Sequence, residues 1–392
     1  MNARSLGWPK QRQSGFTLVE LMVSLVIGLI IILALVALLV NVNRNNTEMT
    51  KANRVVENGR FALQLLEADI QHAGYWGGFV PSFDDLTATG VPADVPTGLP
   101  DPCASTSPTP WSAAYKTNLV GIPIQPYTIA YPIPSPVLGV CASIISNPYV
   151  VPVSGKSNDV LVVRHADTCA AGVGTCAALA SGDMGFQVQR CGITAPATPY
   201  AMGTSGLSLQ NRDCTTTAEI RKFVSNIYYI RNYAATAGDG IPTLMRSQFG
   251  LSGSTLAHKT AEAIIEGIEA FRVELGVDNL SDSGAAVNFT QAINWADASN
   301  LKSPTNRGDG VPDGSFVHCA ATGCTVVQLM NTTAVKIYVL ARNETRTPGY
   351  TDTKTYNLGS LTLGPFNDGF KRHLFVQTIR LNNIASRRET PV

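Results

Sequence analysis

Charged residues are scarce in this chain of 392 residues. Asp, Glu, Lys and Arg make up 15% of it, and the formal net charge is +1. A sparse and balanced charge offers no basic surface for nucleic acid and no strongly acidic surface for a basic partner. Common catalytic motifs are also missing, because the sequence contains neither H-E-x-x-H nor G-x-S-x-G. We therefore expect no nucleic-acid partner and no enzymatic activity.

Zinc motifs are missing as well, since no C-x-x-C occurs and no histidine stands at zinc-ligand spacing beside a cysteine pair. We expect no metal ion, and calcium is the weaker alternative. Asp278, Asp282, Asp309 and Asp313 lie in two turn-rich stretches whose oxygen ligands suit a hard cation. The complete EF-hand pattern is absent, because no glutamate closes the loop. The other reading of these stretches is a pair of Asx turns on the surface.

Charge is absent altogether from Leu21 to Val40, and proline is absent between Gln11 and Val80. These twenty uncharged residues span about 30 Å as a helix, which matches the hydrocarbon core of a bilayer. The sequence thus predicts a long helix over residues 16–73, with its membrane-spanning part at about residues 18–40 and Gly74 as its stop.

The first 15 residues contain Arg4, Lys10 and Arg12 but no acid. Basic residues before an apolar span keep that end in the cytoplasm, so the rest of the chain should lie on the other side of the membrane. The apolar run is longer than that of a secretory signal, and no A-x-A site closes it. The simplest interpretation of this N-terminal segment is a plain signal anchor that only holds the protein in the membrane.

The segment from Gly15 to Glu20 reads GFTLVE and places a carboxylate at the head of the apolar helix. A carboxylate in hydrocarbon is costly and is a functional hypothesis by default. This motif resembles the signal of type IV prepilins and type II secretion pseudopilins. The resemblance implies that a prepilin peptidase cuts between Gly15 and Phe16, removes residues 1–15 and methylates the new amine of Phe16. Glu20 would then pair with the amine of a neighbouring subunit and set axial register; the alternative is that Glu20 only reaches the lipid headgroups.

Beyond the apolar run, small and aliphatic residues recur at steps of three and four up to Ala73. The remaining residues, 74–392, should form a globular head that this half of the helix packs against. Proline dominates its first part, since 14 of 23 prolines lie between Phe79 and Val153, and we expect a loop-rich excursion over about residues 79–155. A helix is expected over Leu256–Glu266. Strands are expected at Asp159–Arg164, Phe223–Tyr233, Phe271–Val277, Ala334–Leu340 and His373–Leu381.

The predicted fold class is therefore α+β: a pilin-like N-terminal helix packed on a mainly antiparallel β head with long proline-rich loops. Several head segments are similar to those of PilW-type minor pilins of the type IV pilus. They are Arg60–Trp76, Tyr228–Arg246, Glu266–Asp278, Lys336–Arg342 and Lys371–Leu381.

The resemblance implies a role in pilus assembly or initiation and a place at the pilus tip. The implied partners are the prepilin peptidase, other minor and major pilins, an inner-membrane assembly platform and a tip adhesin. The implied location is the bacterial inner membrane, with a periplasmic head, and later the pilus. One alternative is a minor pseudopilin of a type II secretion system. A remote alternative is a membrane-anchored periplasmic enzyme or binding protein.

Eight cysteines all follow the apolar run, and an even number in an oxidising compartment indicates disulfides. Eight cysteines allow 105 pairings. Pairing of nearest neighbours closes the most local loops and is our expectation. It joins Cys103 to Cys141, Cys169 to Cys176, Cys191 to Cys214, and Cys319 to Cys324.

Overall fold

The computed structural model describes residues 15, 17–107, 110–129, 141–151, 158–192, 199–296, 303–319 and 323–389. Residues 1–14, Phe16 and most of the proline-rich runs 108–110 and 132–136 lie outside the described residues. The chain divides into two compact units, Met1–Asn53 and Arg54–Val392. The division falls inside the first helix, α1 (Leu18–His72), so the second half of this helix belongs with the head.

The first unit contains α1 up to Asn53, and this part of α1 is the one described helix long and apolar enough to cross a membrane. Its large apolar side chains from Leu21 to Val40 are between 52% and 62% exposed. Such a surface requires lipid or the apolar helices of other proteins around it.

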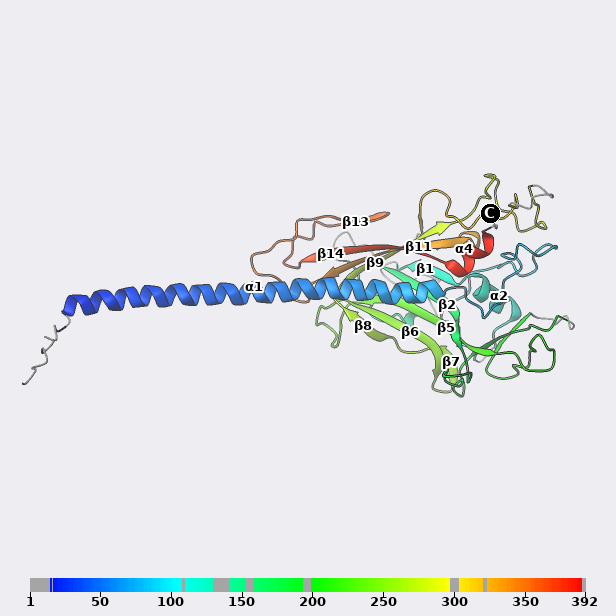
Figure 1. The fold of residues 1–392 in the computed structure, drawn as a ribbon, viewed down its shortest axis with the longest axis horizontal. Helices are drawn as coiled ribbons and strands as arrows, with labels where there is room; N and C mark the ends of the chain where they lie inside the picture. The colour runs from blue at the N-terminus through cyan, green and yellow to red at the C-terminus, as the bar shows by residue number, and fades with distance from the viewer. Residues whose placement is uncertain are drawn as a thin grey trace, which may run out of the picture. The chain divides into compact units, whose positions relative to one another are not determined.

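In the second unit, α1 buries Val55, Gly59, Ala62, Leu66 and Ile70, which recur at steps of three and four. Val55, Ala62, Leu66 and Ile70 share one core with residues from strands of two sheets. These strands lie along this half of α1 in Figure 1. The sequence pattern of this half of the helix is explained by that contact, because a helix buries one stripe along its length.

The larger sheet has eight antiparallel strands in the order β1-β2-β5-β3-β4, with β6 paired to β5, β7 and β8. Their bounds are β1 (Ile124–Thr128), β2 (Asp159–Ala170), β3 (Gly185–Val188), β4 (Tyr200–Gly203), β5 (Ile220–Arg231), β6 (Thr243–Ser252), β7 (Thr255–His258) and β8 (Glu262–Glu266). Residues of β2 alternate between two cores: Leu161 and Val163 share the core with α1, whereas Val160 and Val162 face the other side. The sheet is therefore covered on both faces.

The smaller sheet has four antiparallel strands in the order β10-β9-β11-β14, and a two-stranded sheet pairs β12 with β13. Their bounds are β9 (Ile268–Val277), β10 (Val317–His318), β11 (Thr332–Arg342), β12 (Tyr356–Leu358), β13 (Leu361–Leu363) and β14 (Arg372–Arg380). The structure thus shows the expected fold class, a long apolar N-terminal helix followed by an antiparallel β head.

Three short helices complete the described head: α2 (Ala113–Gly121), α3 (Val326–Met330) and α4 (Asn382–Arg388). Ser112 caps α2 by accepting a hydrogen bond from the Tyr115 amide, and Thr325 with Gln328 forms a capping box on α3. Helix α2 and strand β1 lie inside the stretch expected to be loop, so that expectation is wrong for these two segments.

The helix predicted over Leu256–Glu266 is wrong. Residues Thr255–His258 and Glu262–Glu266 form strands β7 and β8, and both pair with β6. The local sequence LAHKTAEAIIE favours a helix. Backbone pairing with β6 and burial of Leu256 and Ile265 outweigh that weak preference.

Gly59 is required where α1 crosses the small sheet. A Cβ atom at this position would lie 2.0 Å from the ring of Phe375 on β14. Gly59→Ala gains about 1 kcal/mol of helix propensity but forces the ring aside, and overpacking costs about 1–3 kcal/mol. We expect a net loss of about 1 kcal/mol in the free energy of unfolding, measured by urea denaturation of the head.

Two variants check this interpretation of Gly59. Gly59→Ala combined with Phe375→Leu should recover the loss, because the shorter side chain leaves room for the methyl group. Gly28→Ala has no atom within 4 Å of the added carbon and should not destabilise the protein. A Gly59→Ala protein as stable as the native chain would show that the ring relaxes without cost.

Candidate assembly site

Glu20 stands in the first turn of α1 and closes a capping box with Thr17. The Glu20 carboxylate accepts hydrogen bonds from the backbone N–H and the hydroxyl of Thr17, each at 2.9 Å. In return the Glu20 amide donates to the Thr17 hydroxyl at 3.3 Å. The sequence T-x-x-E is the usual signature of this arrangement, and a capping role was not among the expectations for Glu20.

The capping box fixes where the Glu20 charge lies but does not neutralise it. Both donors from Thr17 are neutral groups, and no cation pairs with Glu20 among the residues that the structure describes. Gly15 lies before the helix and is exposed, while its neighbour Phe16 is outside the described residues. An ordered, unpaired carboxylate at the head of an apolar helix can receive a cation from another molecule.

Asp69 joins the end of α1 to the larger sheet. Its carboxylate accepts hydrogen bonds from Asn226 Nδ2 at 3.0 Å and Tyr228 Oη at 3.0 Å, both on β5. His165 on β2 approaches it with Nε2 at 3.1 Å, while Nδ1 faces the carbonyl of Ala166 at 2.8 Å. Asp69 thereby fixes the rotation of α1 on the sheet.

Both ring nitrogens of His165 face oxygen acceptors, which suits the protonated ring that donates from both. Burial lowers the pKa of His165, but the hydrogen bond and the charge of Asp69 outweigh it, so the pKa is raised above its ordinary value. A raised folded-state pKa contributes stability that is present below the unfolded value and is lost as the pH rises through the folded one. The attachment of α1 to the sheet is therefore favoured by acid conditions.

The acidic residues proposed for calcium do not assemble a cation site. Asp278 is fully buried, and Arg388 of α4 reaches it with Nη1 at 3.2 Å and reaches Asp84 with Nε at 2.9 Å. A guanidinium thus occupies the place that we had assigned to a metal ion. Among the described residues, no group of three or more His, Cys, Asp or Glu side chains could hold a metal.

The other three acidic residues have separate roles in the structure. Asp313 accepts the N–H groups of Asn279 and Leu280 at 2.7 Å each, and Asp309 accepts that of Val311 at 2.9 Å. Asp282 is exposed. The two stretches are therefore Asx-type turns held against each other, which was the other reading of their sequence.

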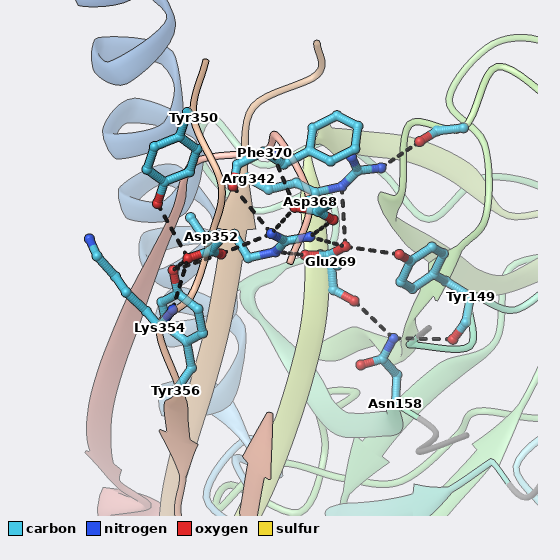
Figure 2. A network of polar contacts seen from close by, with 12 residues as sticks. Tyr149, Asn158, Glu269, Arg342, Tyr350, Asp352, Lys354, Tyr356, Asp368 and Phe370 are labelled. Atoms are coloured by element: carbon cyan, nitrogen blue, oxygen red, sulfur yellow. Dashed lines mark hydrogen bonds and ion pairs between the residues drawn. The ribbon is translucent and has the colours of Figure 1, made fainter. Parts of the chain in front are cut away.

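A second buried network lies beside the small sheet, where carboxylates of Glu269, Asp352 and Asp368 converge (Figure 2). Arg372 on β14 donates to all three, to Asp352 at 2.9 Å and to Asp368 at 2.7 Å. Burial lowers the pKa of Arg372, but hydrogen bonds to Asp368 and Glu269 outweigh it and raise the pKa. The network anchors the segment between β11 and β14 onto the sheet.

The structure contains four disulfides: Cys103–Cys141, Cys169–Cys176, Cys191–Cys214 and Cys319–Cys324. These are the pairs of nearest neighbours expected from the sequence. Cys103 and Cys141 belong to the core on the face of the larger sheet opposite α1, together with Ile129 and Ile145. The bridge thus ties the proline-rich excursion to the sheet that it covers.

Two protein families match separate parts of this chain. The prokaryotic N-terminal methylation motif matches residues 10–36, which include Gly15, Phe16 and Glu20. The family described as Type IV Pilus-assembly protein W matches residues 227–383, which include Asp278, Asp352 and Arg372. These two matches support a PilW-type type IV pilin. The matches imply processing by a prepilin peptidase and contact with other pilins, and they point to a structural protein rather than an enzyme.

Among solved structures, this chain is similar to the type IV-like pilin TTHA1219 from Thermus thermophilus. The two are 12% identical, the match covers 84% of this chain and 98% of that one, and the TM-score is 0.29. A likeness of this size adds nothing on function. A search of curated proteins gives no match. The apolar helix and the methylation motif fit a membrane-anchored component of a pilus.

Proposed function

We propose that this pilin is a minor pilin that takes part in the assembly or initiation of a type IV pilus and ends at the pilus tip. The proposal rests on the ordered Glu20 carboxylate, which lies at the head of an apolar helix. The apolar side chains of this helix are exposed within the first unit. Such a helix end can join a helical stack, because a cation from a neighbouring subunit would neutralise it.

The proposed cation is the amine that peptidase cleavage between Gly15 and Phe16 would release. Methylation of Phe16 leaves that amine able to carry its charge. Before cleavage, the basic residues Arg4, Lys10 and Arg12 favour a cytoplasmic N-terminus in the inner membrane, with the head in the periplasm. The four disulfides suit that oxidising compartment.

The size of the head supports a place at the tip rather than along the shaft. The head unit covers Arg54–Val392, and a body of this size is difficult to repeat in a tightly packed filament. The proposed partners are other minor and major pilins, the inner-membrane assembly platform and an adhesin at the tip. A pseudopilin of a type II secretion system shares the N-terminal chemistry, so the assay must distinguish pilus assembly from secretion.

Gly15→Ala should block processing, because the peptidase needs room for the residue before the scissile bond. The measurement is the mass of the protein recovered from cells that make pili. We expect the native chain to begin at a methylated Phe16 and the variant to keep residues 1–15. Recovery of intact native chain from piliated cells would contradict the assignment.

Glu20→Gln should leave the protein processed and in the membrane yet lower the number of pili severalfold. Glutamine can still bond to Thr17 but carries no charge, so this variant separates the ionic role from the capping role. Thr17→Val, which keeps the charge and removes the hydroxyl, is the matched control and should have the smaller effect. Normal piliation in the Glu20→Gln strain, or a loss of secretion with intact pili, would count against the proposal.

A further inference from the structure

A cavity of about 700 Å³ opens in the head beside the edge strand β4 and the helix α2. Cavities of about 300–1,000 Å³ with mainly apolar walls and a few polar groups are typical of ligand sites. The walls include Phe79 and Tyr200, whose ring centroids lie 5.0 Å apart, and the buried side chain of Met202. None of the contacts described for the N-terminal segment uses this cavity.

The aromatic side of the cavity is held rigidly from behind. The ring of Tyr200 stacks on Phe186 of β3 at 5.3 Å with an interplanar angle of 17°. Phe186 in turn packs on Trp76, at 5.2 Å, just after the end of α1. An aromatic surface that is fixed by its neighbours loses little conformational entropy when a ligand binds to it.

Two of the three charged side chains in the cavity lining are acidic. The carboxylates are those of Asp85 and Asp94, and the cation is Lys116, whose ammonium already donates to the carbonyl of Met202 at 2.9 Å. Asp94 accepts hydrogen bonds from the amide and hydroxyl of Ser82, which are neutral donors. Asp85 likewise accepts the amide and hydroxyl of Thr87. Neither carboxylate forms an ion pair within the part of the head that the structure describes.

We propose that this cavity binds a segment of a partner protein that presents a lysine or arginine next to an aliphatic residue. The aliphatic side chain and the stem of the basic one would cover Phe79, Tyr200 and Met202. The cationic group would reach Asp85 and Asp94. An acidic segment is disfavoured because its charge repels both carboxylates, and a purely apolar one leaves them without a partner.

Three dipeptides test whether the cavity prefers a basic residue next to an aliphatic one. The full-length protein is studied in lipid nanodiscs, because free detergent would compete for the apolar walls of the cavity. The probes are acetyl-Leu-Arg-amide, acetyl-Leu-Glu-amide and acetyl-Ser-Arg-amide, and the measurement is isothermal titration calorimetry. We expect the first to bind with a dissociation constant of about 1 mM and the other two to bind at least about tenfold more weakly. Equal binding of all three, or no heat from the first at about 10 mM, would overturn the proposal.

Two variants locate the binding in the cavity. Ala113→Trp fills it from an exposed position on α2, and Asp85→Asn removes one charge while keeping the oxygen that accepts from Thr87. Both should weaken acetyl-Leu-Arg-amide, whereas Val173→Trp on an exposed loop should not. Unchanged affinity in Ala113→Trp would place the binding elsewhere and refute the site. This test needs no pilus, so its failure would leave the proposed function of the N-terminal segment unaffected.

Discussion

Replacing Arg372 by methionine should lower the free energy of unfolding by about 5 kcal/mol, because it leaves buried carboxylates without their cation. The side chains of Arg372, Glu269 and Asp352 are between 0% and 2% exposed. Removing one partner of a buried ion pair costs about 3–5 kcal/mol. Here one guanidinium serves three carboxylates, and Arg342 remains near only one of them, with its Nε 3.4 Å from Glu269.

Urea denaturation followed by near-ultraviolet circular dichroism would measure the loss of Arg372. The matched control is Arg380→Met on the same strand, because Arg380 and its partner Glu389 are each 47% exposed. That change should cost less than about 1 kcal/mol. Arg372→Lys should fall between the two, since lysine keeps the charge but cannot donate in a planar fork. If Arg372→Met and Arg380→Met are equally stable, the buried network does not hold the head together.

The parts of this molecule that the sequence predicted well are those that depend on neighbours along the chain. The apolar run, the amphipathic half of α1 and the strands β2, β5, β9, β11 and β14 follow from local periodicity. The GFTLVE motif is likewise local, and the family match to residues 10–36 covers it. The nearest-neighbour pairing of cysteines agrees with the structure because each bridge closes a loop of 38 residues or fewer.

The parts that the sequence could not predict depend on residues far apart. Arg388 meets Asp84 across 304 positions, and Arg372 meets Glu269 across 103. No spacing rule connects such pairs, so the sequence left calcium as an alternative for Asp278, whose partner Arg388 lies near the other end of the chain. The helix predicted over Leu256–Glu266 failed for a different reason, because a tight turn joins β6 to β7 and pairing with β6 decided the conformation of both β7 and β8. One local signal was missed: the T-x-x-E pattern already indicated that Thr17 and Glu20 form a capping box.

Replacing Arg388 by methionine is the second change that we expect to be severe, at about 3–5 kcal/mol. The side chain of Arg388 is 3% exposed and joins Asp84 at 2.7 Å, Asp278 at 3.2 Å and the carbonyl of Met330 at 3.0 Å. It therefore links α4 to the loop after α1 and to the turn that follows β9. Burial raises the pKa of Asp278 to about 6, although Arg388 opposes that rise. Without the guanidinium, Asp278 would be buried with no cation, and Asp84 would keep only Arg387, at 4.0 Å.

Further substitutions at Asp84 and Asp278 show whether Arg388→Met destabilises the protein through unpaired buried carboxylates or through lost packing. Amides cost less free energy to bury than carboxylates. If the unpaired carboxylates are the main cost, Arg388→Met combined with Asp84→Asn and Asp278→Asn should therefore be more stable than Arg388→Met alone. Arg387→Met is the control on the same helix, since Arg387 lies 4.0 Å from Asp84 and mainly donates to the carbonyl of Gly74. It should cost about 1 kcal/mol. If the triple variant is no more stable than Arg388→Met, the arginine acts by filling space and hydrogen-bonding Met330, and the electrostatic explanation fails.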